Sequence, residues 1–254
     1  MKKRLIALLS LLACLCLLRV DSASAADVSA GNCAREKLSR CNITTLLTNR
    51  YTEGRPVIIF FPGYDEATSN KNLINFIRNY HLYDDVEIDL VAVTLRGSTP
   101  WHRDWEPACR DLYDFLKDKY AASPFPIVVD SLSLGGYGGC WLTEYFRKNG
   151  IPVRELNLAD ACGSWCISAD WLRELAAGGT RVNIWGCGGS LNISKDTRAI
   201  IAELEGTENI QCVTMASSHG AVLSNAIHEY GLHAEYAVKQ EESDEQTEQT
   251  EQTE

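Results

Sequence analysis

A serine and a histidine occupy positions where the chain could build a nucleophile and its base. Ser133 is the middle residue of the stretch SLSLG (131–135), directly after an apolar run and directly before a glycine-rich segment. A sharp strand-to-helix turn with a serine at its apex requires small residues two positions to either side, because bulky ones would collide. His219 follows another apolar run and could accept the proton that makes a serine hydroxyl nucleophilic. We therefore predict Ser133 as the nucleophile and His219 as the general base.

The surrounding segments predict the elements that would position these side chains. Apolar runs typical of buried strands lie at 56–61, 86–95, 125–130, 153–159, 181–186 and 209–215. Most are continuous rather than alternating, which favours a parallel sheet covered on both faces. Helical spacing of apolar residues recurs between them, at 106–121, after Ser133, and near the end from Val222 to Tyr230. The pattern predicts an α/β fold with a doubly wound, mostly parallel sheet and helices on both faces.

On these motifs the chain resembles an α/β-hydrolase over roughly residues 55 to 236. PVIIFFPGYDEAT (56–68) is similar to the strand and His-Gly loop that supply part of the oxyanion hole, with Pro62 in place of the usual histidine. AVTLRGS (92–98) is similar to the Arg-Gly loop of the family, and TMASSHGAVLS (214–224) places His219 where the family keeps its catalytic histidine. The resemblance implies an oxyanion hole formed by the backbone N–H groups of Tyr64 and Leu134.

The carboxylate that should orient His219 has two candidates. The family usually places this acid a few residues after the strand at 181–186, but the matching position, near Ser190, is not acidic. Asp160, at the end of LNLAD, resembles the acid of the pancreatic-lipase subgroup, which follows an earlier strand. Asp196 is the alternative, although its place before TRAIIAEL also suits a helix cap. We rank Asp160 first and Asp196 second.

Composition and charge limit the other function classes. The chain has 254 residues and a net charge of −10, with no basic patch that would indicate binding to nucleic acid or to an anionic membrane. Residues 1–25 are typical of a signal peptide, with a basic start, an apolar run and a small-residue cleavage site. The acidic repeats at 239–254 predict a disordered tail. We expect an N-terminal segment at 26–54 and a hydrolase domain at 55–238, secreted or periplasmic, with no integral membrane segment after cleavage of the signal.

Cysteine usage predicts disulfides rather than a metal site. Eight of the ten cysteines lie outside the leader, and an even number in an exported chain is typical of disulfide bonds. The close pairs Cys33/Cys41 and Cys162/Cys166 are the first candidates. A zinc site at Cys162 and Cys166 is disfavoured because the sequence has no second CxxC and no nearby histidine. We expect no metal and no cofactor.

These observations predict a secreted serine esterase that acts on a small-molecule or lipid-like ester. Only about twenty residues separate Asp160 from the strand that begins at Arg181, which leaves no room for the cap domain that the family inserts near there. An open site similar to those of small cutinase-like or lipase-like enzymes follows. A thioesterase or peptidase with the same triad is one alternative. A non-catalytic binding protein on a hydrolase scaffold is another, motivated by Pro62 and by the non-acidic Ser190.

Overall fold

The computed structural model describes residues 33–37, 41–46, 56–67, 69–84, 86, 88–95, 102–120, 127–163 and 167–237. The predicted signal peptide, the predicted acidic tail and the Arg-Gly pair at 96–97 lie outside these residues. None of the helices in the described ranges is long and apolar enough to cross a membrane.

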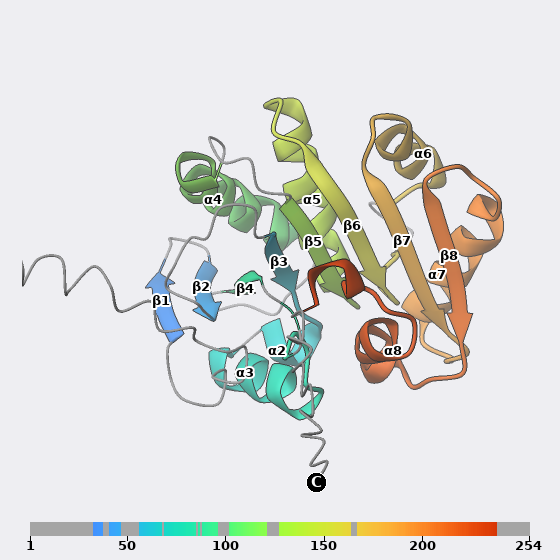
Figure 1. Cartoon of the computed structure of the whole chain (residues 1–254), viewed down its shortest axis with the longest axis horizontal. Helices are drawn as coiled ribbons and strands as arrows, with labels where there is room; N and C mark the ends of the chain where they lie inside the picture. The colour runs from blue at the N-terminus through green and yellow to red at the C-terminus, as the bar shows by residue number, and fades with distance from the viewer. Residues whose placement is uncertain are drawn as a thin grey trace, which may run out of the picture.

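One sheet of eight strands forms the centre of the molecule, and its strands follow the order β1-β2-β4-β3-β5-β6-β7-β8 across Figure 1. All six predicted strands are present, and they run parallel to one another. They are β3 (Val57–Phe61), β4 (Asp89–Leu95), β5 (Ile127–Leu132), β6 (Val153–Ala159), β7 (Arg181–Cys187) and β8 (Ile210–Met215). The central strands β3 and β5 are buried at every position, as expected of parallel strands that are covered on both faces.

Two further strands extend the sheet at its β4 edge. The hairpin β1 (Cys33–Lys37) and β2 (Cys41–Leu46) is antiparallel, and β2 pairs antiparallel with β4. Residues 33–37 and 41–46, which precede the predicted hydrolase domain, therefore contribute strands to the same sheet.

Helices cover both faces of the sheet and enclose two hydrophobic clusters. On one face, α4 (His102–Tyr120), α5 (Gly135–Lys148), α6 (Ala169–Ala177) and α7 (Asn192–Leu204) pack against side chains such as Ile59 and Leu158. On the other, α3 (Asn70–Asn79) and α8 (Val222–His228) pack against side chains such as Phe60 and Trp185. The short elements α2 (Tyr64–Ala67), η2 (His219–Ala221) and η3 (Ala234–Tyr236) complete the chain. The arrangement confirms the predicted doubly wound fold.

The register of the β1–β2 hairpin contradicts the predicted Cys33–Cys41 bridge. Cys33 is paired with Leu46, whereas Cys41 lies at the opposite end of β2. The intervening length of strand spans about 16 Å. Cysteines whose Cα atoms are more than about 7 Å apart cannot be bridged without movement of the backbone.

The other predicted pairing, Cys162–Cys166, involves a residue outside the described ranges. Three described cysteines are free thiols: Cys109, Cys187 and Cys212. The expectation that the cysteines outside the leader would all be paired is therefore wrong for these three.

Candidate active site

The predicted strand-to-helix turn is present, and Ser133 is at its apex. Ser133 follows β5 and has a φ of +53°, a left-handed value that is uncommon for residues other than glycine. Its backbone N–H donates to the carbonyl of Ala159 at 3.1 Å, and its own carbonyl accepts from the N–H of Gly136 at 3.0 Å. The turn is thus held against the end of β6, which fixes a strained conformation of the kind found at functional sites.

The glycines after Ser133 let α5 begin in close contact with neighbouring backbone. A Cβ on Gly135 would lie 2.1 Å from the carbonyl oxygen of Phe61, at the end of β3. A Cβ on Gly136 would lie 2.0 Å from the carbonyl oxygen of Ala161, just beyond β6. Both distances are far below contact distance, so only glycine fits at either position. This explains why the sequence places glycines directly after the serine.

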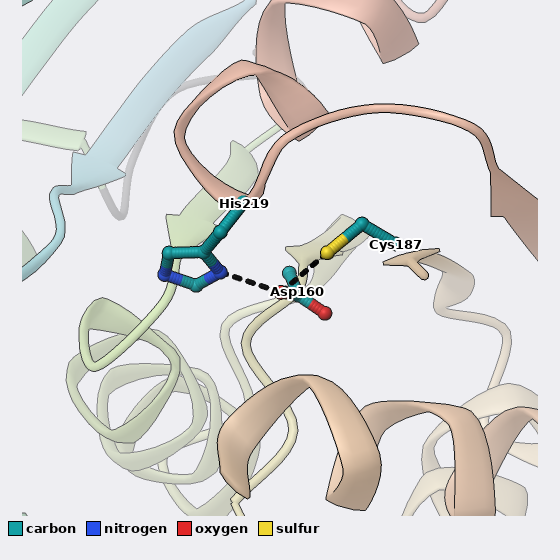
Figure 2. Close-up of side chains that lie close together, drawn as sticks. All are labelled: Asp160, Cys187 and His219. Carbon is teal, nitrogen blue, oxygen red and sulfur yellow. Dashed lines mark hydrogen bonds and ion pairs between the residues drawn. The ribbon is translucent and has the colours of Figure 1, made fainter. Parts of the chain in front are cut away.

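Asp160 and His219 meet at the same edge of the sheet, beyond the ends of β6 and β8 (Figure 2). Nδ1 of His219 lies 2.5 Å from Oδ2 of Asp160. The aspartate side chain is fully buried, whereas 24% of the histidine side chain is exposed. Because β5, β6 and β8 are parallel, their carboxyl ends lie on one side of the molecule, and Ser133 follows the end of β5 on that side.

The charge of Asp160 determines which nitrogen of His219 is left available. Burial raises the pKa of Asp160, but hydrogen bonds from His219, Ser194 and Cys187 outweigh it, so the pKa is lowered from its ordinary value. An ionised carboxylate only accepts hydrogen bonds, so Nδ1 of His219 must be the donor. In the neutral imidazole, Nε2 then carries the lone pair, as a general base requires.

The loop after β3 passes directly beside Ser133. A Cβ on Gly63 would lie 3.5 Å from the Cβ of Ser133. Tyr64, the next residue, begins α2, and its side chain is exposed. Leu134 occupies the N-cap position of α5, and its N–H donates to none of the described residues. Both predicted oxyanion-hole residues therefore belong to turns that adjoin Ser133.

The sequence matches no protein-family model and none of the curated proteins compared with it, but its structure is similar to several solved ones. An enterochelin esterase from Shigella flexneri aligns at 17% identity with a TM-score of 0.51, over 81% of this chain and 58% of that one. An alpha-beta hydrolase from Vibrio vulnificus aligns at 18% identity and a TM-score of 0.54, over 78% of each chain. A type II thioesterase of the yersiniabactin pathway aligns at 10% identity and a TM-score of 0.50, over 77% of this chain and 97% of that one. The chain has the α/β-hydrolase fold.

The chain spans only part of some of the solved structures that it matches. It spans 58% of the length of the enterochelin esterase. Between β6 and β7, where the sequence predicts no room for a cap domain, the described residues form the single helix α6. Trp105, in the first turn of α4, is fully buried, with its ring packed edge-on against Phe61.

The loop after β7, where this fold usually carries its acid, supports Asp160 instead. Sγ of Cys187, at the end of β7, lies 3.2 Å from Oδ2 of Asp160 (Figure 2), and the hydroxyl of Ser194, on α7, donates to the same oxygen. Arg198 holds this loop by donating to the carbonyls of Cys187 and Gly189 at 2.6 and 2.9 Å. Sequence reasoning missed Cys187 and Ser194, because no local pattern links them to an aspartate that lies more than twenty residues earlier.

Asp196 lies inside α7 rather than at its cap. The helix begins at Asn192, and its N-cap residue is Leu191, which makes no side-chain capping bond. The capping role that the sequence suggested for Asp196 is therefore wrong. The carboxylate that hydrogen-bonds His219 belongs to Asp160.

Asp160, Cys187 and His219 also have the donor types of a metal site, and their ligating atoms lie within 4.8 Å of one another. A tetrahedral zinc ion with bonds of 2.0–2.3 Å would hold its ligand atoms more than about 3.2 Å apart. The 2.5 Å between Oδ2 of Asp160 and Nδ1 of His219 is instead a hydrogen-bond distance. The cluster is thus arranged around the aspartate oxygen and not around a vacant central point.

Proposed function

We propose that this protein is a serine hydrolase that cleaves carboxylic esters through an acyl-enzyme on Ser133. The observation that carries the proposal is the hydrogen bond between Asp160 and His219, at the sheet edge where Ser133 occupies a strained turn. A nucleophile, a base and a buried carboxylate from three different strand ends are the parts that acyl transfer requires. The similarity to solved esterases and a thioesterase supports the fold on which this chemistry is built.

In the proposed mechanism, Nε2 of His219 accepts the proton of the Ser133 hydroxyl as its oxygen attacks the ester carbonyl. The buried charge of Asp160 stabilises the imidazolium that forms. His219 then donates this proton to the leaving alcohol, and the acyl group remains on Ser133. Water activated by the same histidine attacks the acyl-enzyme, releases the acid and regenerates the serine.

The negative charge that develops on the carbonyl oxygen needs donors beside Ser133. We assign this role to the backbone N–H groups of Tyr64 and Leu134. Tyr64 directly follows Gly63, whose Cβ position lies 3.5 Å from the Cβ of Ser133, and Leu134 directly follows Ser133 at the N-cap of α5. Removal of a single such donor in other enzymes lowers kcat about 10²- to 10³-fold.

A fluorophosphonate probe, which reacts only with activated serines, tests the proposal. Wild-type protein should be labelled, and Ser133→Ala should abolish the labelling. Ser190→Ala is the matched control, because it makes the same chemical change at an exposed serine beyond β7, and it should leave labelling unchanged. Labelling that persists in Ser133→Ala would contradict the proposal. Folded wild-type protein that is never labelled would favour a binding protein on this fold.

Esters and thioesters with the same acyl group separate the two acyl-transfer activities. We expect turnover of small p-nitrophenyl esters, because the described residues between β6 and β7 form a single helix rather than a cap domain. A kcat/KM that is higher for the thioester of the same acid would instead identify a thioesterase, for which the same residues would act. Export is a separate proposal: the amino terminus of protein recovered from outside the cytoplasm should begin close to residue 26.

A further inference from the structure

A second carboxylate, Glu66, lies beside the proposed nucleophile, and the mechanism above does not use it. Glu66 is on α2, three residues after Gly63. The point where a Cβ on Gly63 would lie is 3.0 Å from Oε2 of Glu66 and 3.5 Å from the Cβ of Ser133. The carboxylate of Glu66 and the side chain of Ser133 therefore flank the same small volume above the Gly63 backbone.

Glu66 is half-buried and forms no ion pair among the described residues. Burial and the neighbouring charge of Asp65 raise the pKa of Glu66, whereas its own backbone N–H and the charge of His219 lower it, and the net direction is upward. The influence of His219 places this carboxyl in the electrostatic field of the active site. A glutamate remains mostly charged at neutral pH unless its pKa approaches about 7.

A carboxylate at this position disfavours the chemistry of an ordinary ester. Gly63 precedes Tyr64, whose N–H we assign to the oxyanion hole, so the charge of Glu66 lies next to the place where the carbonyl oxygen becomes negative. Like charges in a half-buried site repel one another, and the repulsion grows as the transition state forms. A substrate that places a positive charge beside its carbonyl would convert this repulsion into attraction.

We propose that Glu66 selects esters whose acyl group carries a protonated amine on the carbon next to the carbonyl, that is, α-aminoacyl esters. This inference rests on the proposed function and specifies the substrate class of the same site. The ammonium group of such an ester is two bonds from the carbonyl carbon, within reach of a carboxylate that shares the space above Gly63 with Ser133. The attraction strengthens binding and offsets the repulsion between Glu66 and the developing oxyanion.

A matched pair of substrates tests the inference. The p-nitrobenzyl ester of alanine carries an ammonium group where the p-nitrobenzyl ester of isobutyric acid carries a methyl group of similar size. The measured quantity is the ratio of kcat/KM for the two esters. We expect wild-type protein to prefer the alanine ester and Glu66→Gln to lower the ratio at least about tenfold, as loss of a partly buried ion pair implies.

Asp65→Asn is the matched control, because it removes the same charge from the neighbouring, exposed position of α2. It should change the ratio less than about threefold, since an exposed charge is screened by solvent and salt. An unchanged ratio in Glu66→Gln, or an equal change in Asp65→Asn, would overturn the inference. A preference for amine-bearing esters that appears only when the amine is on the alcohol part of the ester would also overturn the inference.

Fluorophosphonate labelling distinguishes failure of this inference from failure of the proposed function. If wild-type protein and Glu66→Gln are both labelled at Ser133 and the ratio is unmoved, the inference alone is wrong. If folded wild-type protein is not labelled, the esterase proposal and the inference both fail.

Discussion

Replacement of Asp160 by asparagine should lower the rate of acylation about a thousandfold. The carboxylate is fully buried and lies 2.5 Å from Nδ1 of His219. Two opposite charges whose centres are about 4 Å apart attract each other by about 4 kcal/mol at an effective dielectric constant of about 20. Asparagine removes this attraction from the imidazolium that forms in the transition state. Each 1.4 kcal/mol is about a tenfold change in rate, so the loss is about 10³-fold.

Asparagine should nevertheless keep the geometry of the site. The three donors His219, Ser194 and Cys187 all point to Oδ2 of Asp160, whereas Oδ1 has no partner among the described residues. The amide oxygen should therefore occupy the position of Oδ2, so that Nδ1 of His219 continues to donate. The charge is removed while the tautomer is preserved. The amide NH₂ then takes the position of Oδ1, where it leaves a buried donor unpaired at a cost of about 1–3 kcal/mol in stability.

The second-order rate constant of fluorophosphonate labelling and the kcat/KM for p-nitrophenyl acetate measure the loss directly. Thermal unfolding of each variant checks that the lower rate does not reflect loss of structure. Asp196→Asn is the matched control on α7 and should stay within about threefold of wild type. The reasoning is refuted if folded Asp160→Asn retains rates within tenfold of wild type, or if Asp196→Asn shows the larger loss.

The remaining predictions concern stability and thiol chemistry. Gly136→Ala should destabilise the protein by about 3 kcal/mol or more, because its Cβ would lie 2.0 Å from a backbone oxygen, whereas Gly188→Ala, with open space around it, should be nearly neutral in urea unfolding. His233→Asn should cost about 3–5 kcal/mol, because it leaves the buried charge of Asp130, 2.9 Å away, without its ionic partner. Burial lowers the pKa of His233, but the charge of Asp130 outweighs burial and raises this pKa, so the stabilisation from the ion pair is lost as pH rises through the folded-state pKa of His233. Burial raises the pKa of Asp130, but the charge of His233 outweighs burial and lowers this pKa, so the stabilisation is also lost as pH falls through the folded-state pKa of Asp130. The difference between wild type and variant should therefore be largest between about pH 4 and about pH 6.5 and shrink on both sides, and a difference that does not vary with pH would contradict the ion pair. Burial raises the pKa of the Cys109 thiol. Without reductant, this cysteine should therefore resist alkylation in the native protein and be alkylated once the protein is unfolded. If unfolded protein yields no alkylated peptide that contains Cys109, the cysteine is in a disulfide and the prediction is wrong.

Sequence reasoning could predict the parts of this protein that depend on local patterns. Continuous apolar runs predict the six parallel strands, because the side chains of a strand covered on both faces are mostly apolar. The stretch SLSLG and the glycines after it predict the turn at Ser133, because the steric demands of a sharp turn fall on residues adjacent in the chain. The order of the elements then places Ser133 and His219 at the carboxyl ends of parallel strands.

Tertiary structure decided what depends on residues distant in the chain. Spacing could not show which carboxylate hydrogen-bonds His219, since this depends on how β6, β7 and β8 lie beside one another and on donors such as Cys187. No sequence pattern links His233 to Asp130, more than a hundred residues earlier, yet the two side chains are buried and hydrogen-bonded to each other. No sequence pattern distinguishes Glu66 from the other acids, and only packing places it beside Ser133. The physical reason is common to all three: the field and contacts at a buried group come from the elements packed around it, and the linear sequence does not order those elements in space.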